Sequence, residues 1–442
     1  MLVRKRSSSL GQISQIALAY GLHAHRFKQT DASTQPQGPL AGFRVLDLGQ
    51  VVAGNFCGAL LAYFGADVIK VEQPGKGDAL RSLRFSDSTG TSLWWRTYGR
   101  NRRCVTINLH HEEGRELTRQ LAEKADVLLE NFRPGVMEKW NLGPKDLSPG
   151  LIFTRISGYG QTGPKASLAG YASVCEGYGG LRHLNGFPDM PPVRPNFSYG
   201  DSLAGLHAAF GTVMALLHRQ RKSDAADSFQ TSHGQVIDAS ISESVFNMLE
   251  GCISEYAMLG HDRQPSGSTI SGVVPTSTTR TKDGRWVIIG GNGDSVYSRL
   301  MAAVGHPEMG TDNPKYANNT KRCAAQDEIY KVIDEWVESK TLDEVLAAMK
   351  EARVPSGPIL SPGDIYKEEQ FQQRNMFHTA QPPGDESGEP VVMPAMLPVL
   401  SETPGSTKWA GPSLGQHTEE VLRGELGLKV KEIQRLRDVG AI

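Results

Sequence analysis

An aspartate stands between a glycine and a serine where a long apolar run begins, in the stretch YGDSLAGLHAAFGTVMALLHR at 199–219. Apolar residues recur in this run at three- and four-residue spacing, which predicts a helix. Asp201 has two interpretations. It is among the best helix N-caps, because its oxygens accept free backbone N–H groups, and a carboxylate can also act as a nucleophile. From this stretch alone, capping is the favoured interpretation.

Dinucleotide, disulfide and zinc chemistry have little support. The turn GQVVAGNFCG carries glycines at 49, 54 and 58, which is not the G-x-G-x-x-G fingerprint of nicotinamide cofactors, and no glycine-lysine phosphate loop occurs. The five cysteines are an odd number without a C-x-x-C pair. They predict neither a disulfide framework nor a metal site, and they favour a reducing compartment.

The bulk composition is that of an ordinary globular protein. The chain has 442 residues, of which 39% are hydrophobic and 21% charged, with a formal net charge of −1. This length allows about two or three domains. The balanced charge argues against nucleic acid as the main partner. No apolar stretch approaches the roughly 18–20 residues of a membrane helix, so we expect no membrane partner.

The N-terminal 30 residues differ from the rest of the chain. They contain five arginines and lysines, a run of serines at 7–9 and no acid, and their apolar residues fall on one helical face. This pattern is typical of a mitochondrial transit peptide, and a basic tail without an address is the alternative. We therefore expect residues 1–35 to be a targeting segment and the protein to act in the mitochondrial matrix.

Strand and helix patterns alternate from residue 43 onward. Strands are predicted at 43–49, 66–72, 104–109, 126–132, 151–158 and 235–241, with helices at 55–65 and 112–125. Near-continuous apolar strands between helices predict an α/β fold with a parallel sheet covered on both faces. We expect a large domain over 38–225 that is completed by 380–442, with a linker and a smaller α+β domain over 226–379.

Eight phrases in order resemble the class III CoA-transferases, the group of formyl-CoA and carnitine CoA-transferases. They are GPLAGFRVLDLGQVVAG (38–54), GADVIKVEQPGKGD (65–78), ENFRPGVMEKWNLG (130–143), ISGYGQTGP (156–164), the stretch at 199–219, TKDGRWVIIGGNGD (281–294), ARVPSGPI (352–359) and PSLGQHTEEVL (412–422). The resemblance implies a Rossmann-like large domain built from both chain ends, a small domain and an interlocked homodimer.

The same resemblance implies that Asp201 is the nucleophile, which reverses the preference for capping. The carboxylate would attack an acyl-CoA thioester, forming a mixed anhydride and then an aspartyl-CoA thioester. CoA would pass to a free carboxylic acid. A helix N-terminus would help to keep the carboxylate ionised. No permanently bound cofactor and no metal is implied, because the CoA thioester is itself a substrate.

The resemblance also implies residues that bind the substrates. The CoA contacts are expected at Val51, Ala53, Arg102, Arg103, Asn131, Phe132 and Lys139, where the three basic side chains would reach the phosphates. The acyl and acceptor contacts are expected at Val52, Tyr159 and Gln161. Two positions depart from the family pattern, since Gln73 replaces a frequent arginine and Ala172 a frequent aspartate.

The acceptor is inferred from the first turn. Oxalate-using relatives carry a glutamine where this chain has Val52, and an apolar wall favours an acid with methylenes between its carboxylates. We therefore expect CoA transfer from succinyl-CoA to a dicarboxylate such as glutarate, with hydroxymethylglutarate and itaconate as alternatives. An α-methylacyl-CoA racemase would share the fold. It needs a histidine and a glutamate as acid/base pair, where this chain has Tyr171, Ala172 and Asn292.

Overall fold

The computed structural model describes residues 38–225, 233–384 and 389–442, so the targeting segment expected at 1–35 lies outside the described residues. Six strands form the main sheet, and every neighbouring pair runs parallel. They are β1 (Arg44–Asp47), β2 (Asp67–Glu72), β3 (Arg102–Thr106), β4 (Val127–Glu130), β5 (Ile152–Ser157) and β6 (Val236–Ser240). The predicted α/β class is confirmed.

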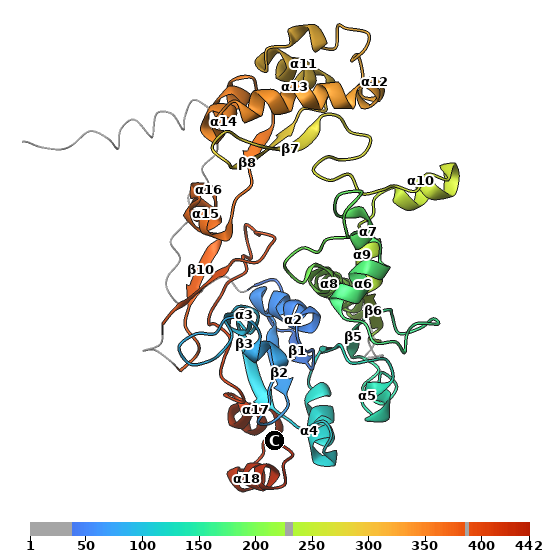
Figure 1. The fold of residues 1–442 in the computed structure, drawn as a ribbon. Helices are drawn as coiled ribbons and strands as arrows, with labels where there is room; N and C mark the ends of the chain where they lie inside the picture. Colours follow the sequence, from blue (N-terminus) through green and yellow to red (C-terminus); the bar gives the residue numbers. More distant parts are fainter. Residues whose placement is uncertain (1–37, 226–232, 385–388) are drawn as a thin grey trace, which may run out of the picture. The chain divides into compact units, whose positions relative to one another are not determined.

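The strand order β3-β2-β1-β4-β5-β6 is that of a Rossmann-like sheet. The chain builds outward from β1 to β3 and then returns to place β4 on the other side of β1. Figure 1 shows β3, β2 and β1 towards one edge of this sheet and β5 and β6 towards the other. In open sheets of this kind, ligands bind outside the carboxyl ends of the strands where the strand order reverses. The place to search for a site is therefore the end of β1 and β4.

Helices from both ends of the described chain cover this sheet. The helices α2 (Ala53–Tyr63) and α8 (Tyr199–Ala225) share one hydrophobic core with alternate strand residues such as Val45. The helices α4 (Glu112–Ala122), α17 (Thr418–Leu426) and α18 (Val430–Asp438) share the other core, which includes Leu46. Neighbouring strand residues point to opposite faces, which explains this division. The C-terminal helices α17 and α18 thus pack on the same sheet as the N-terminal strands.

A second core lies around a small antiparallel sheet. Its strands are β7 (Thr276–Arg280), β8 (Trp286–Gly290) and β9 (Ser356–Pro358). The helical elements in this part are α11 (Asp294–Ala303), η2 (Pro307–Met309), α12 (Asn319–Ala324), α13 (Gln326–Glu338) and α14 (Leu342–Glu351). This core runs from Val274 to Val354. Residues Val236–Ser240 do not belong to this core, because they form β6, which pairs with β5 of the main sheet.

Shorter elements connect these parts. In the first half they are η1 (Ala79–Ser82), α3 (Leu93–Tyr98), α5 (Val136–Lys139), α6 (Ala172–Tyr178), α7 (Leu181–Leu184), α9 (Ile241–Phe246) and α10 (Cys252–Leu259). In the second half they are α15 (Pro362–Lys367), α16 (Glu369–Gln373) and the antiparallel strands β10 (Phe377–Ala380) and β11 (Val391–Pro394).

Helix α8 buries most of its small residues and exposes most of its large ones. Ala204, Ala208 and Ala215 are buried, and a Cβ at Gly205 would lie 2.7 Å from the carbonyl oxygen of Ala53, so α8 and α2 approach closely. The exposed large residues are Leu206, Phe210, Val213, Met214 and Leu217. Contrary to the sequence analysis, α8 is long and apolar enough over Tyr199–Lys222 to cross a membrane, by length and composition alone. Its small-residue face packs in the core as buried helices do.

Candidate functional site

A cavity of about 230 Å³ lies where the strand order reverses. It is lined by the segments that follow β1, β4 and β5, together with the start of α8. The predicted residues brought together here are Val51, Val52, Ala53, Asn131, Phe132 and Asp201. The fold therefore brings six of the eleven candidate residues together, at the position where open α/β sheets bind their ligands.

The turn after β1 is held by buried charges. Asp78 accepts hydrogen bonds from the backbone N–H of Val51 at 3.1 Å and from the side-chain amide of Asn55 at 2.7 Å. Lys70 donates to the carbonyl oxygen of Gly49 and lies 3.3 Å from Asp78. Asp78, Lys70 and Asn55 are all buried. A buried charge is stable when it is paired and hydrogen-bonded, so this network holds the turn rigidly.

Val51 shows how tightly the turn is held. Its φ angle is 57°, in the left-handed region that a β-branched residue rarely adopts. Such a conformation persists only where its surroundings determine it, and it is found mostly at functional sites. The hydrogen bond to Asp78 helps to determine the conformation of Val51, and Val51 lines the candidate cavity.

Asn131 ties the ends of β1 and β4 together. Its side-chain oxygen accepts from the backbone N–H of Gln50 at 2.6 Å, and its amide donates to the carbonyl oxygen of Gln50 at 2.9 Å. The backbone N–H of the next residue, Phe132, donates a hydrogen bond to the carboxylate of Glu130 at 2.7 Å, and the Phe132 ring packs edge-on against Trp140. These contacts fix one wall of the cavity on the strand ends.

The first turn of α2 supplies backbone donors to the cavity. Val52 is the N-cap and no side chain caps this end of the helix. The first N–H groups of a helix have no partner within the helix, and they favour negative charge. Val52 and Ala53 both line the cavity, so an oxyanion formed there would meet these donors.

Asp201 is the carboxylate in the cavity that can act as a nucleophile. It lies in the first turn of α8, which begins at Tyr199, so it is not the N-cap. Burial, with the nearby negative charge of Glu176, raises its pKa to about 6, and Arg194 opposes this shift. The helix N-terminus, expected to help keep the carboxylate ionised, does not prevent this rise, because desolvation by burial is the largest effect on its pKa. The carboxylate is still mostly ionised at neutral pH and is more basic than an ordinary aspartate.

Sequence reasoning missed Glu176, the acid that adjoins Asp201. Glu176 lies on α6 and is fully buried. Its carboxylate accepts from the backbone N–H of Gly200 at 3.1 Å and pairs with Arg182 at 3.2 Å. The one signal in the sequence is that this acid stands alone among small and apolar residues, in ASVCEGYGG at 172–180. The family position at Ala172 begins the same helix and is buried.

Two basic residues expected at the CoA phosphates have other partners. Arg102 is fully buried, 2.7 Å from Asp47 and 2.8 Å from Asn55. Arg103 pairs with Asp67 at 2.6 Å and Glu425 at 3.1 Å. Both guanidinium groups are thus held in structural ion pairs, which does not support a role in binding phosphate. Arg102 and Arg103 are successive residues of β3, so their side chains point to opposite faces of the sheet and cannot both reach one ligand.

The remaining predicted residues do not line the cavity. Lys139 is exposed at the end of α5, the helix that follows cavity-lining Arg133 and Pro134. The ring of Tyr159 stacks edge-on against Tyr178 at 5.2 Å. The backbone N–H of Gln161 donates to Asp238 at 2.8 Å.

The exposed aromatic residue in the cavity wall is Tyr171, which the sequence analysis considered only as a family difference.

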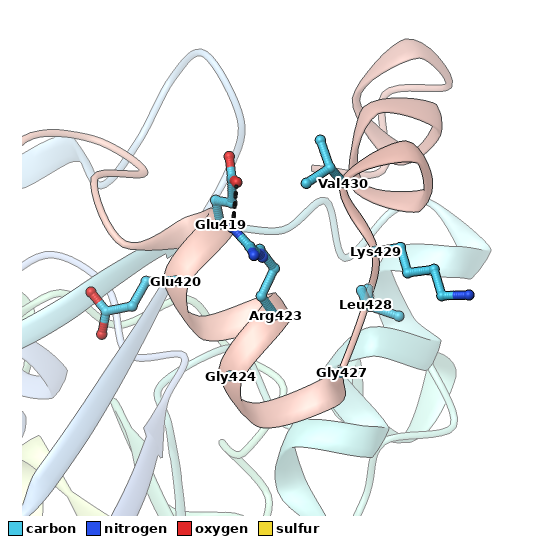
Figure 2. Close-up of a pocket in the computed structure, with 8 residues that line it drawn as sticks. All are labelled: Glu419, Glu420, Arg423, Gly424, Gly427, Leu428, Lys429 and Val430. Atoms are coloured by element: carbon cyan, nitrogen blue, oxygen red, sulfur yellow. Dashed lines mark hydrogen bonds and ion pairs between the residues drawn. The ribbon is translucent and has the colours of Figure 1, made fainter.

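A larger hollow between α17 and α18 is not the candidate site (Figure 2). Its volume is about 850 Å³. It is lined by Glu419, Glu420, Arg423, Gly424, Gly427, Leu428, Lys429 and Val430. Arg423 is paired with Glu419 at 3.3 Å, so the charges of the wall partly cancel. None of the predicted site residues lines it.

Comparison with known proteins identifies the family of this chain. The family model for CoA-transferase family III matches residues 40–418. The chain is 41% identical over 409 residues to "Succinyl-CoA--D-citramalate CoA-transferase" of Chloroflexus aurantiacus, which covers 92% of this chain and 98% of the relative. It is 29% identical to "Succinyl-CoA:glutarate CoA-transferase" of Homo sapiens, covering 91% and 90%. The chain is thus more similar to the citramalate enzyme than to the glutarate enzyme.

A solved structure has the same fold. The CAIB/BAIF family protein from Brucella suis superposes with a TM-score of 0.75 at 29% identity, covering 88% of this chain and 100% of that chain. The matched family region includes the turn after β1, the segment after β4 and Asp201. The resemblance read from the sequence is confirmed, and the chain belongs to CoA-transferase family III.

Proposed function

We propose that this protein transfers CoA from succinyl-CoA to a free dicarboxylic acid through covalent intermediates on Asp201. The observation that carries the proposal is the position of this carboxylate. It lies in a cavity at the carboxyl ends of β1 and β4, with a raised pKa and next to uncapped backbone N–H groups. A nucleophile and an oxyanion-binding helix end in one cavity are what acyl transfer requires.

The reaction needs only exchanges at acyl carbons. A carboxylate oxygen of Asp201 attacks the thioester carbonyl of the donor, the C–S bond breaks, and CoA leaves as a thiolate while a mixed anhydride forms. The thiolate then attacks the aspartyl carbonyl and releases the donor acid as a carboxylate, leaving an aspartyl-CoA thioester. The acceptor carboxylate attacks this thioester, and the returning thiolate takes the acceptor acyl group and regenerates Asp201.

Each attack forms a tetrahedral oxyanion. The backbone N–H groups at the start of α2 would stabilise it, because Val52 and Ala53 line the cavity and the helix end favours negative charge. Val51, Ala53, Asn131 and Phe132 would meet the CoA moiety. Lys139 is the exposed cation that we retain for the phosphates, whereas Arg102 and Arg103 are engaged in ion pairs.

The acceptor class follows from the cavity wall and the relatives. Val52 offers an apolar surface to the methylenes between two carboxylates. The similarity to a citramalate transferase adds citramalate as a candidate acceptor, beside glutarate, hydroxymethylglutarate and itaconate.

The test combines trapping with an acceptor panel. Incubation with succinyl-CoA followed by hydroxylamine should place a hydroxamate on the peptide that holds Asp201, seen by mass spectrometry. Asp201→Asn should show neither adduct nor turnover. Steady-state rates with the four candidate acids would then identify the acceptor. A wild-type enzyme that turns over without an adduct on Asp201 would contradict the covalent route.

We also propose that the protein acts as a homodimer. Helix α8 exposes five large apolar residues, and α10 exposes Met258 and Leu259. Large exposed apolar patches on soluble proteins mark interaction surfaces. A second copy of this chain is the occupant we propose, since the family resemblance implies an interlocked dimer.

The mitochondrial location is likewise a proposal, carried by the acid-free basic sequence at 1–30. A fusion of residues 1–35 to a fluorescent protein should be imported into mitochondria. The same fusion with Arg4, Lys5 and Arg6 changed to glutamate should stay outside, and import of both would contradict the proposal.

A further inference from the structure

The first turn of α8 rests on a buried carboxylate from another helix. Glu176 of α6 accepts a hydrogen bond from the backbone N–H of Gly200, the residue that precedes Asp201. The packing is close, because a Cβ at Gly200 would lie 3.1 Å from Cγ of Glu176 and 3.0 Å from Cγ2 of Ile241. Any movement of Glu176 would therefore shift the backbone that carries Asp201.

Two arginines balance the charge of Glu176 unequally. Arg182 donates to it through both Nε and Nη2, at 3.3 and 3.2 Å, and also to Ser173 at 3.0 Å. Arg194 approaches the same oxygen only to 3.7 Å, and 42% of its side chain is exposed. Arg182 is thus a fixed structural partner. Arg194 is a looser cation that acts on both carboxylates.

We propose that Glu176 is a positioning residue for the nucleophile: it fixes the first turn of α8 through Gly200 and places a negative charge beside Asp201. The proposal rests on the function proposed above. Like charges at close range disfavour each other, so Glu176 makes the Asp201 carboxylate more basic. A more basic carboxylate is the stronger nucleophile towards a thioester, as long as it remains ionised at the working pH.

The other titratable groups around Asp201 are neutral at physiological pH. Burial raises the pKa of the Cys175 thiol to about 11, and Asp201 adds to this shift. Burial raises the pKa of the Tyr98 hydroxyl on α3 above its usual value, again with a contribution from Asp201. Glu176 and Arg194 are therefore the charged groups that act on the nucleophile, with opposite signs.

Opposite signs make the proposal testable by two substitutions. The experiment measures the single-turnover rate at which succinyl-CoA forms the CoA adduct on Asp201, as a function of pH, by rapid quench and mass spectrometry. Glu176→Gln keeps a carbonyl oxygen that can accept from Gly200 and removes the charge. Its pH midpoint should move down by about one unit, and its plateau rate should fall roughly tenfold. Arg194→Gln should move the midpoint up.

Glu176→Asp separates position from charge. It keeps the negative charge but withdraws it by one methylene from Gly200, so the plateau rate should fall with little change of midpoint. Thermal unfolding of each variant reports how much of it is folded. A loss of structure alone lowers the amount of adduct but moves no midpoint, so it cannot imitate the expected pair of opposite shifts.

Unchanged midpoints in both charge variants, or shifts in the same direction, would overturn the proposal. Should Glu176→Gln not fold, Glu176→Asp decides, because it shortens the side chain that holds Gly200, and a plateau rate equal to that of the wild type would refute the positioning role. Adduct formation by the wild-type enzyme tests the proposed function separately. Without any wild-type adduct both proposals fail, whereas an adduct without opposite shifts overturns only the role of Glu176.

Discussion

The carboxylate of Asp78 accepts the backbone N–H of Val51 at 3.1 Å, across 27 residues of chain. The same carboxylate accepts from Asn55 and from the backbone N–H of Leu80, and it lies 3.3 Å from buried Lys70. One buried acid thus organises the turn that forms the cavity wall, without lining the cavity itself. The shape of the cavity wall therefore depends on the buried ion pair of Asp78 and Lys70 behind it.

Asp78→Asn should therefore weaken substrate binding more than chemistry. The amide replaces one acceptor oxygen by a donor and leaves Lys70 without its nearest acid, which we expect to cost about 3 kcal/mol of folding free energy. With the turn loosened, KM for succinyl-CoA should rise about tenfold while kcat changes less. Steady-state kinetics and urea unfolding measure the two effects.

Asp343→Asn is the control for that substitution. Asp343 is an exposed acid in the first turn of α14, away from the described cavity. The substitution should leave KM unchanged and the free energy of unfolding within a few tenths of a kcal/mol of the wild type. An Asp78→Asn enzyme with normal KM and a proportionate loss of kcat would show that the network only supports folding.

The sheet was predictable because its signals are local. The strand expected at 151–158 is β5 at Ile152–Ser157, and that expected at 235–241 is β6 at Val236–Ser240. Buried strands must be apolar almost throughout, so they stand out in sequence. The turn after β1 was found for the same reason, since it follows the first such strand. Its strained Val51 was not, because the cause lies in Asp78, far along the chain.

The basic residues and α8 could not be predicted in the same way. A sequence shows that Arg102 is charged, but only the fold shows it buried against Asp47. The apolar spacing of α8 predicts a helix, yet it does not tell a core face from an interface. Here the small residues face the core, while Phe210 is 60% exposed. Glu176 was missed because its partners come from α7 and α8.

The acylation rate should depend on pH through Asp201. Its carboxyl group must be ionised to attack, and burial with the nearby Glu176 charge raises its pKa to about 6. The rate of adduct formation should therefore rise with pH, pass its midpoint near pH 6 and level off above it. Rapid-quench measurements across this range test the prediction, and a midpoint near the ordinary aspartate value would contradict it.

Asp201→Asn should abolish activity and stabilise the fold. Below the ordinary aspartate pKa the carboxyl is neutral in both folded and unfolded chains. Between that value and about 6 only the folded chain keeps its proton, and above 6 the folded chain must hold a desolvated charge. Each pKa unit corresponds to about 1.4 kcal/mol, so the neutral amide should gain up to about 3 kcal/mol above the upper midpoint.

Urea unfolding at two pH values measures that gain. The difference between Asp201→Asn and wild type should be largest near pH 8 and should shrink as the pH falls towards 4. Asp189→Asn, in an exposed loop, is the matched control and should show no such trend. A wild-type protein as stable as Asp201→Asn near pH 8 would mean that the carboxylate is well solvated in the folded state.

Phe210→Glu should disrupt assembly without disturbing the fold of the single chain. The Phe210 side chain is 60% exposed, so it contributes little to the core, and a charge there would have to be desolvated in an interface built on α8. Light scattering coupled to size-exclusion chromatography should give twice the chain mass for the wild type and a smaller mass or a lower yield for the variant. Gln220→Glu adds the same charge at an exposed position of the same helix and should assemble normally. If the wild type runs as a single chain, or if both variants assemble equally, the exposed face of α8 is not where two copies meet.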